Sequence, residues 1–416
     1  MRMTETSRGG GHGAESQAEP QAEPQAEPQA ESQAESQNGS LLRFEHESLA
    51  QRVRFASGEA AALVRAEVER LGASRVMVIA AAAEAELAQT VTAGLPVVLR
   101  WDEVVMHVPI EVAERARDAA AVCQADLLLS VGGGSTTGLA KAIALTGGLP
   151  IVAVPTTYAG SEATSVWGLT EQARKTTGVD VRVLPRSVVY DATLTVSLPV
   201  PMSVASGLNA LAHCVDAMWG PRVDPIDQAL AGEGIRALAA GLPAVVADPA
   251  GLPGREQTLY GTYLSAVAFS SAGSGLHHKI CHVLGGMYDL PHAQTHAVVL
   301  PHVLAFNAPA APETERRIAA AFGAGSAIDG LERLRRDVDA PRALRDYGLK
   351  ETDAEDAVQA VLDVVPDGNP RPVTAEDIRR LLRAAWRGAD PRTMTDDSTT
   401  TNSTTTNSMT RRTHGD

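Results

Sequence analysis

Short apolar runs alternate with helical stretches over the first half of the chain, and this alternation restricts the possible folds most. The runs at 75–80, 97–100, 126–131 and 150–155 are almost continuously apolar, and helical patterns at 59–71 and 110–123 precede two of them. Strands of this composition are typically buried on both faces of a parallel sheet that helices cover. Residues 41–198 are therefore predicted to form an α/β domain with a Rossmann-like parallel sheet.

The rest of the chain changes character after residue 198. Helical periodicity dominates from 199 to 388, which predicts an all-helical second domain. Residues 1–40 are dominated by a repeated Ala-Glu-Pro/Ser-Gln unit, and residues 389–416 are rich in Thr, Ser and Asn. Such segments lack the apolar side chains whose burial offsets the entropy of ordering, so both tails are predicted to be disordered.

Composition excludes several classes of partner. The formal net charge of −14 argues against nucleic acid, because phosphate binding requires a basic surface. The 3 cysteines cannot all pair within the chain, which favours reduced thiols. No apolar run approaches the roughly 18–20 residues of a membrane helix, and the N-terminus lacks the apolar segment of a secretory signal. We therefore expect a cytoplasmic protein that binds neither nucleic acid nor membrane.

A glycine-rich turn follows the third predicted strand. Glycines allow the backbone to approach a ligand closely, and the N–H groups that open the next helix attract phosphate. Ser135 and Thr136 are expected to cap that helix. A tight turn without a ligand is the alternative, because the pattern is not the G-x-G-x-x-G fingerprint. The candidate coenzyme-binding residues here are Gly132, Gly133, Gly134, Ser135, Thr136, Lys141, Thr156 and Thr157.

Five polar side chains of the helical part have a suggestive spacing. Asn209 and His213 are four residues apart and share a helix face, and His278 and His282 repeat this spacing. His292 follows a proline at a loop. Isolated histidines are most often core residues, but two such pairs and a loop histidine in one helical domain favour a shared pocket.

This set of side chains is poor in the ligands that a metal prefers. Iron or zinc sites normally include an anionic ligand or a matched neutral set. Asn209 supplies only an amide, although Asp216 is seven residues later and could share its face. We therefore predict a site without a tightly held metal.

Four segments resemble the iron-type alcohol dehydrogenases, which have a dehydroquinate synthase-like fold. They are LLLSVGGGSTTGLAKAIAL, VPTTYAGSEATSVWGLTE, SGLNALAHCVDAMWG and GLHHKICHVLGGMYDLPHAQTHAVVLPHV, and the likeness extends over 41–387. The resemblance implies that the glycine turn binds the pyrophosphate of a nicotinamide coenzyme. It places the family's metal positions on Asn209, His213, His278 and His292. Asn209 departs from the family's aspartate, and Gly138 stands where metal-dependent relatives usually carry another aspartate.

Both departures, with TYAGSE at 157–162 and Asn369-Pro370-Arg371, resemble the maleylacetate reductase branch. This implies a homodimer that uses NADH or NADPH to reduce a small dicarboxylate, maleylacetate, to 3-oxoadipate in bacterial breakdown of aromatic compounds. The alternatives are a metal-dependent alcohol dehydrogenase or aldehyde reductase, and a dinucleotide-binding protein without turnover.

The reduction of an enone places charge on the ketone oxygen and needs a proton at the neighbouring carbon, so hydrogen-bond donors and an acid are required. The catalytic candidates are His278, His282, His213 and His292. The substrate-binding candidates are Tyr158, Ser161, Thr164 and Asn209, with cationic histidines adding charge. The resemblance places Lys175 near the nicotinamide ribose.

The first strand of the sheet bears on the choice of coenzyme. It ends at Val78-Ile79-Ala80 and is followed by alanines, with no aspartate placed to bind a ribose 2′-hydroxyl. Such an acid would repel the additional phosphate of NADPH. Its absence predicts that both coenzymes are used.

Overall fold

The computed structural model describes residues 42–171 and 174–394. From Phe44 onwards the described residues form one compact unit. The predicted tails fall largely outside the described residues. Residues 389–394 of the predicted C-terminal tail are described, and Met394 is 2 % exposed. Packed structure therefore continues beyond residue 388, where disorder was predicted. The division of the folded part into two domains at residue 198 stays a prediction.

Six strands form a parallel sheet in the order β1-β8-β5-β4-β2-β3, which confirms the predicted α/β class. The four predicted runs correspond to β2 to β5. The sequence patterns did not predict β1, β8 or the antiparallel hairpin of β6 and β7. The bounds are β1 Arg52–Phe55, β2 Val76–Ile79, β3 Val97–Trp101, β4 Leu127–Gly132, β5 Ile151–Pro155, β6 Val166–Glu171, β7 Arg174–Val179 and β8 Ser187–Tyr190.

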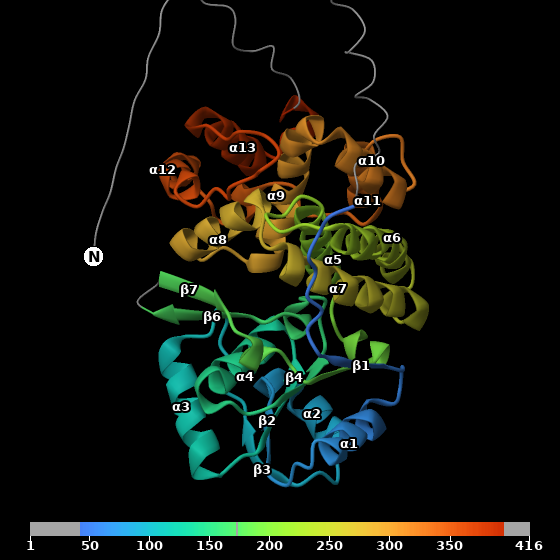
Figure 1. Cartoon of the computed structure of the whole chain (residues 1–416), viewed down its shortest axis with the longest axis vertical. Coiled ribbons are helices and arrows are strands. Elements are labelled where there is room, and N and C mark those ends of the chain that lie inside the picture. The colour runs from blue at the N-terminus through green and yellow to red at the C-terminus, as the bar shows by residue number, and fades with distance from the viewer. Residues whose placement is uncertain (1–41, 172–173, 395–416) are drawn as a thin grey trace, which may run out of the picture. The chain divides into compact units, whose positions relative to one another are not determined.

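Helices cover both faces of this sheet (Figure 1). Val76 and Val78 pack with residues of α1 and α2, whereas Met77 and Ile79 pack with residues of α3 and α4. Alternate residues of a strand point to opposite faces, so a strand that is apolar throughout fits between two helical layers. The bounds are α1 Ala60–Arg70, α2 Ala85–Val91, α3 Ile110–Val122 and α4 Gly134–Gly147.

The second half of the chain is helical, as predicted. Its helices lie beyond the end of the sheet from which the glycine turn projects (Figure 1). The helices are α5 Val200–Ala217, α6 Pro225–Ala247, α7 Leu252–Ala272, α8 Leu276–Tyr288, α9 His292–Asn307, α10 Pro312–Ala321, α11 Ala327–Asp337, α12 Glu351–Leu362 and α13 Ala375–Arg387. Salt bridges such as Arg379–Glu355 and Arg387–Glu351 join α13 to α12.

Small residues allow α6 and α7 to approach each other closely. A Cβ atom added to Gly241 would lie 2.9 Å from the carbonyl oxygen of Gly254, and one added to Gly254 would lie 2.8 Å from the backbone nitrogen of Val245. Backbone atoms cannot move away as the end of a flexible side chain can. Glycine is therefore required at this crossing, which explains how a chain with only 4 % aromatic residues packs its core.

One helix corrects an expectation about apolar runs. By length and composition α6 is the one helix among the described residues that could cross a membrane, although no run of that kind was expected. The expectation considered continuous apolar runs, whereas the Ala, Leu, Ile and Val residues of α6 are interrupted by only a few charged residues and still give a high mean hydropathy. Ala231, Ile235 and Leu238 of α6 are fully buried against α5 and its neighbours. We interpret α6 as a core helix.

His302 offers a test of how burial affects acid stability. It lies in α9 with 1 % exposure, and burial lowers its pKa to about 3, with Arg335 adding to the effect. The unfolded chain takes up a proton near pH 6.5 and the folded chain does not, so His302 destabilises the fold as the pH falls below 6.5. Relative to wild type, His302→Gln is expected to gain about 2.5 kcal/mol in unfolding free energy between pH 7 and pH 4.5. Urea unfolding at both pH values measures this, and a constant difference between the two proteins would contradict it.

Candidate active site

The glycine turn between β4 and α4 has a backbone that only glycine adopts without strain. Gly132 has a φ of 153°, and a Cβ there would lie 2.5 Å from Glu84 Oε2 and 2.9 Å from Thr136 Cβ. Gly133 is the N-cap of α4 and no side chain caps the helix, so the expected capping by Ser135 and Thr136 is wrong. The first N–H groups of α4 have no partner within the helix and are available to an anion.

A carboxylate beside this turn was not predicted. Glu84 ends a short 3-10 helix, Ala82–Glu84, and Thr156 Oγ1 donates to its Oε1 over 2.7 Å. Burial raises the pKa of Glu84, whereas its hydrogen bonds lower it. No acid directly follows β2 in the sequence. Glu84 stands five residues beyond Ile79, and the 3-10 helix returns it to the glycine turn.

Lys141 is fully buried and positions the chain that follows β5. Its Nζ donates to Thr164 O over 2.8 Å, to Thr164 Oγ1 over 3.0 Å and to Val166 O over 2.8 Å. Burial lowers the pKa of Lys141 to about 7, and Glu162 partly opposes this. These bonds use the three hydrogens of the ammonium. In this arrangement Lys141 and Thr164 hold each other rather than a coenzyme or a substrate.

Tyr158 also faces the core. Its side chain is 0 % exposed, and its hydroxyl accepts a hydrogen bond from Arg255 Nη1 over 3.3 Å. Arg255 is itself 0 % exposed and otherwise donates to backbone carbonyls, including that of Pro249 over 2.7 Å. The arrangement therefore gives Tyr158 a structural role and does not support its prediction as a substrate ligand.

One loop connects the glycine turn with the predicted histidines. Thr157 packs on Gly133, where an added Cβ would lie 3.0 Å from Thr157 Cγ2. Three residues later Gly160 packs on His213, with 3.5 Å between its ideal Cβ and His213 Nδ1. Ser161, which is half-buried, begins the 3-10 helix that follows. The loop after β5 thus contacts both halves of the predicted site.

The two predicted histidine helices bring their side chains together. The ring of His213 on α5 stacks on that of His278 on α8, with 4.8 Å between centroids and 14° between planes. Phe269 packs against both rings. Asn209 Oδ1 and His213 Nδ1 are buried and lack a hydrogen-bond partner among the described residues. Buried polar atoms usually have a partner, so these atoms are candidates to contact a ligand.

Asp216 orients His278. Its Oδ2 is hydrogen-bonded to His278 Nδ1 over 2.7 Å and accepts from the backbone N–H groups of His278 and Gly275 over 3.1 Å each. Burial raises the pKa of Asp216 to about 7, although the backbone N–H groups lower it. His278 Nε2 is left without a partner among the described residues. Such carboxylate–imidazole pairs fix the orientation and tautomer of a reacting histidine.

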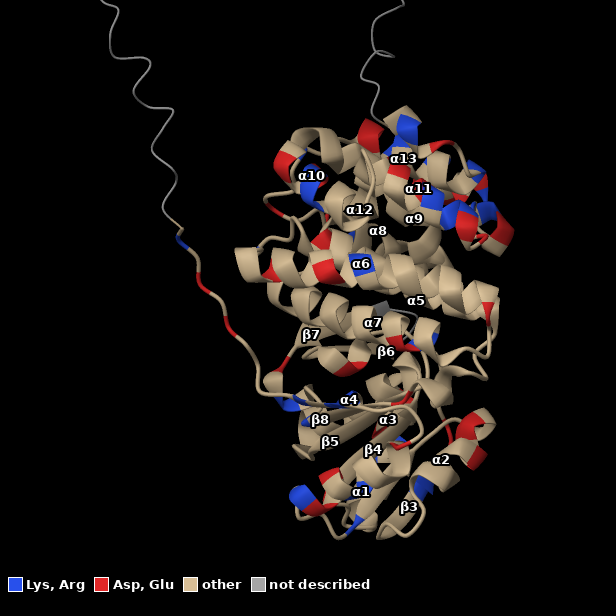
Figure 2. Ribbon diagram, turned by 90° about the vertical axis from the view of Figure 1, so that its right-hand side faces the viewer, with Lys and Arg blue, Asp and Glu red and all other residues tan. Residues whose placement is uncertain are grey.

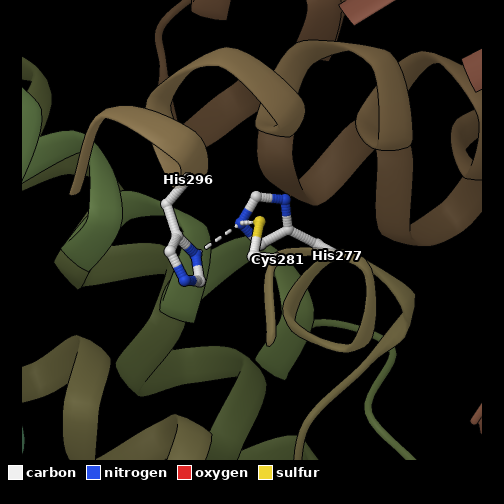
Figure 3. Close-up of side chains that lie close together, drawn as sticks. All are labelled: His277, Cys281 and His296. Atoms are coloured by element: carbon white, nitrogen blue, oxygen red, sulfur yellow. Dashed lines mark hydrogen bonds between the residues drawn. The ribbon is translucent and has the colours of Figure 1, made fainter. Parts of the chain in front are cut away.

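A second pair, His277 and His296, was not predicted. His277 Nε2 and His296 Nδ1 are 2.8 Å apart, and Cys281 Sγ lies 3.7 Å from His277 Nε2 (Figure 3). The His296 ring lies 4.4 Å from that of His292 and 4.7 Å from that of His278, measured between centroids. Because one of the two bonded nitrogens must carry the hydrogen, the tautomer of His296 is coupled to that of His277.

The remaining predicted residues lie at the rim of this cluster or outside it. His292 is exposed and His282 is half-buried, with 6.0 Å between the ring centroids of His282 and His278. Lys175 pairs with Thr170 in the β6–β7 hairpin, but its side chain lies outside the described part of the chain.

The buried imidazoles are neutral at pH 7. Burial lowers the pKa of His213 to about 4 and that of His277 to about 3, and it lowers those of His278 and His296 well below the usual value. These shifts do not support the expectation that cationic histidines attract a dicarboxylate. The four imidazoles serve as neutral hydrogen-bonding groups.

The Asn-Pro-Arg segment joins the end of the chain to α9. Asn369 and Asn307 exchange two side-chain hydrogen bonds of 3.0 and 2.9 Å, and Arg371 lies over the ring of Phe306 at 4.6 Å. These contacts hold a loop on the helix that carries His296.

The carried-over metal positions do not fit a bound iron. Asn209 brings no charge and its amide oxygen is a poor ligand for iron, so the set lacks the anionic ligand that the family's aspartate supplies. Among the described residues, two groups of at least three His, Cys, Asp or Glu side chains have their ligand atoms within 4.8 Å of one another, and neither contains His213, His278 or His292. We assign no metal to these residues, and the absence of a tightly held metal stays a prediction.

Comparisons with known proteins agree with this arrangement. Residues 50–192 match the family described as iron-containing alcohol dehydrogenase, and residues 203–386 match its C-terminal part. A maleylacetate reductase of Cupriavidus pinatubonensis is 46 % identical over 85 % of this chain and 99 % of its own length. One from Pseudomonas sp. (strain P51) is 43 % identical over 84 % and 99 %.

Solved structures show the same likeness. An iron-containing alcohol dehydrogenase from Corynebacterium glutamicum is 61 % identical with a TM-score of 0.84, and covers 85 % of this chain and 99 % of its own. A maleylacetate reductase from Agrobacterium tumefaciens is 40 % identical with a TM-score of 0.80, and covers 84 % and 100 %. With its sheet, glycine turn and histidine helices in these positions, the chain belongs to the iron-containing alcohol dehydrogenase family.

Proposed function

We propose that this chain is a maleylacetate reductase, which reduces the carbon–carbon double bond of maleylacetate to 3-oxoadipate with NADH or NADPH. One observation carries the proposal: the Asp216–His278 pair lies beside His213, and the loop on which His213 packs also packs on the glycine turn. The relatives named maleylacetate reductase match this chain over almost their whole length.

The glycine turn fits the pyrophosphate of a dinucleotide. Gly132 to Gly134 leave the backbone accessible, and the first N–H groups of α4 lack helical partners. When bound, the reduced nicotinamide supplies the hydride. Thr157, which packs on Gly133, and Gly160, which packs on His213, keep the turn and the histidines in a fixed relation.

The histidine cluster supplies the proton and the hydrogen bonds. Hydride addition to the alkene carbon β to the ketone moves an electron pair to the ketone oxygen, and the neighbouring carbon then takes a proton. Because the pKa of Asp216 is about 7, its pair with His278 holds a proton for part of the time at neutral pH. In that state the carboxyl group donates to Nδ1, and His278 Nε2 carries a hydrogen that it can deliver. Asn209 and His213 are the neighbouring groups that contact the substrate.

Oxidation of NADH by maleylacetate, followed by absorbance with enzyme stripped by EDTA, tests this function. Turnover well above background in stripped enzyme supports it. Aldehyde reduction that requires added iron or zinc, without maleylacetate turnover, would favour a metal-dependent alcohol dehydrogenase instead. Coenzyme binding without any turnover would indicate a binding protein.

Glu84 is expected to influence the choice of coenzyme. Its carboxylate lies beside the glycine turn, where it disfavours a further phosphate on the coenzyme. In Glu84→Gln the ratio of kcat/KM for NADPH to that for NADH is expected to rise about 10-fold, which corresponds to about 1.4 kcal/mol. Paired steady-state kinetics measure it, with Glu86→Gln on α2 as the control. An unchanged ratio would place the adenosine ribose away from Glu84.

We also propose that the enzyme is a cytoplasmic homodimer without a nucleic-acid or membrane partner. Its cysteines are free, and Figure 2 shows Lys and Arg interspersed with Asp and Glu over the C-terminal helices. Sedimentation equilibrium tests the dimer, and a monomer at micromolar concentration would contradict it.

A further inference from the structure

A second group of potential metal ligands lies at the start of α6 and shares no residue with the histidine cluster. His46, from the segment before β1, approaches two aspartates: its Nδ1 is 2.7 Å from Asp224 Oδ2 and 3.8 Å from Asp227 Oδ1. The three ligand atoms lie within 4.8 Å of one another. The side chains of His46, Asp224 and Asp227 are 10 %, 4 % and 0 % exposed.

The hydrogen bonds of Asp224 leave one oxygen for this group. Asp224 is the N-cap of α6, and its Oδ1 accepts from the backbone N–H groups of Ile226 over 2.7 Å and Asp227 over 3.0 Å. The other oxygen, Oδ2, faces His46. Capping of the helix and binding of a cation therefore do not compete for the same atom.

Asp227 has no such partner. Neither of its carboxylate oxygens has a donor in good hydrogen-bond geometry among the described residues; a weaker side-chain hydrogen bond with Ser271 and the charge of His46 lower its pKa. Burial and the charge of Asp224 raise that pKa. A fully buried carboxylate that lacks a well-placed donor destabilises the fold, because taking a charge out of water requires a compensating charge or hydrogen-bond donor.

The charges of the group do not balance without a cation. The two carboxylates carry two negative charges, and the imidazole carries at most one positive charge. Among the described residues, no lysine or arginine forms a salt bridge with Asp224 or Asp227. Both aspartates pair with His46 alone. A divalent cation with a neutral imidazole brings the site to zero net charge.

The distances suit such an ion. Zinc lies about 2.0–2.2 Å from an imidazole nitrogen or a carboxylate oxygen. Two ligands at that distance, at tetrahedral or octahedral angles, are about 3.0–3.4 Å apart, and the observed 2.7 and 3.8 Å lie on either side of this range. The His277–Cys281–His296 group is less suitable for such an ion, because it contains no carboxylate and its two imidazoles are hydrogen-bonded to each other.

We propose that His46, Asp224 and Asp227 form a structural site for a borderline divalent cation, with Zn²⁺ as its typical occupant. The ion would join the segment before β1 to the first turn of α6, across 178 residues of sequence. The same segment is held at its other end by Gln51, whose Nε2 donates to the carbonyls of Glu162 and Pro185 over 2.9 Å each. The site therefore stabilises the attachment of the first strand and does not depend on the reductase activity.

The test uses the full chain, stripped with a chelator and then titrated with zinc sulfate. Bound zinc is measured by elemental analysis after gel filtration, and the melting temperature by circular dichroism. Wild type is expected to bind one zinc with micromolar or tighter affinity and to melt several degrees higher with it. Asp227→Asn and His46→Gln are expected to lose both the bound zinc and the shift.

Two control variants identify the ligands. Asp377→Asn alters an aspartate at the position in α13 that matches Asp227 in α6. Asp377 bonds to its own N-cap residue Thr374 and pairs with Arg380, and the variant should keep the shift. Cys281→Ser disables the other candidate group and should also keep it. Retention in both controls with loss in both site variants supports the site. The proposal is overturned if wild type shows no zinc effect, if the shift persists in Asp227→Asn and His46→Gln, or if Cys281→Ser abolishes it.

Discussion

Asp216→Asn is expected to lower kcat for maleylacetate by roughly 100-fold or more while changing KM little. The asparagine cannot hold the proton that the Asp216–His278 pair shares, and its amide hydrogens would face His278 Nδ1 and change the tautomer of the ring. The substitution slows the delivery of the proton, which takes place in the transition state. A change of this kind lowers kcat and leaves ground-state binding in place.

Steady-state kinetics with saturating NADH measure this effect, and circular dichroism confirms that the variant is folded at the assay temperature. Asp248→Asn, at the exposed end of α6, is the matched control and should retain wild-type kcat. A kcat for Asp216→Asn within threefold of wild type would show that the pair has no part in protonation.

Gly132→Ala is expected to weaken NADH binding by at least about 100-fold. At a φ of 153° an L-residue is strained by about 1–3 kcal/mol. The added methyl group would also lie 2.5 Å from Glu84 Oε2 and 2.9 Å from Thr136 Cβ. The turn must then move, and the N–H groups that open α4 move with it, so the pyrophosphate loses its donors.

Titration of NADH by fluorescence gives the dissociation constant, and urea unfolding separates lost affinity from lost stability. Gly232→Ala in α6 is the control, since the nearest heavy atom to its new methyl group is Met218 Cε at 3.7 Å. It should bind NADH normally and change stability by less than about 1 kcal/mol. If Gly132→Ala bound NADH with wild-type affinity, the glycine turn would not be part of the coenzyme site.

The sequence predicted the features that depend on local pattern. Continuous apolar runs identified β2 to β5, and a spacing of four residues placed Asn209 with His213 and His278 with His282. Edge strand β1, with the sequence RVRF and two exposed residues, has too little apolar content to be recognised in this way. The β6–β7 hairpin depends instead on a contact between Gly178 and the ring of Trp167.

The missed parts of the site depend on contacts between distant residues. Asp216 and His278 are 62 residues apart, and nothing in the spacing of either indicates the other. His277 and His296 lie on two helices whose packing determines their hydrogen bond. Burial also argues against two expectations, because it makes the clustered histidines neutral and turns Lys141 toward backbone carbonyls.

The loop after β5 has a consequence for how this enzyme can change. Thr157 and Gly160 are three residues apart, one against the coenzyme turn and the other against a ring of the reaction centre. A substitution that displaces either residue displaces both, so cofactor affinity and turnover will vary together among variants of this loop. Selection for a new substrate is therefore expected to alter the helices first and to leave this short segment unchanged.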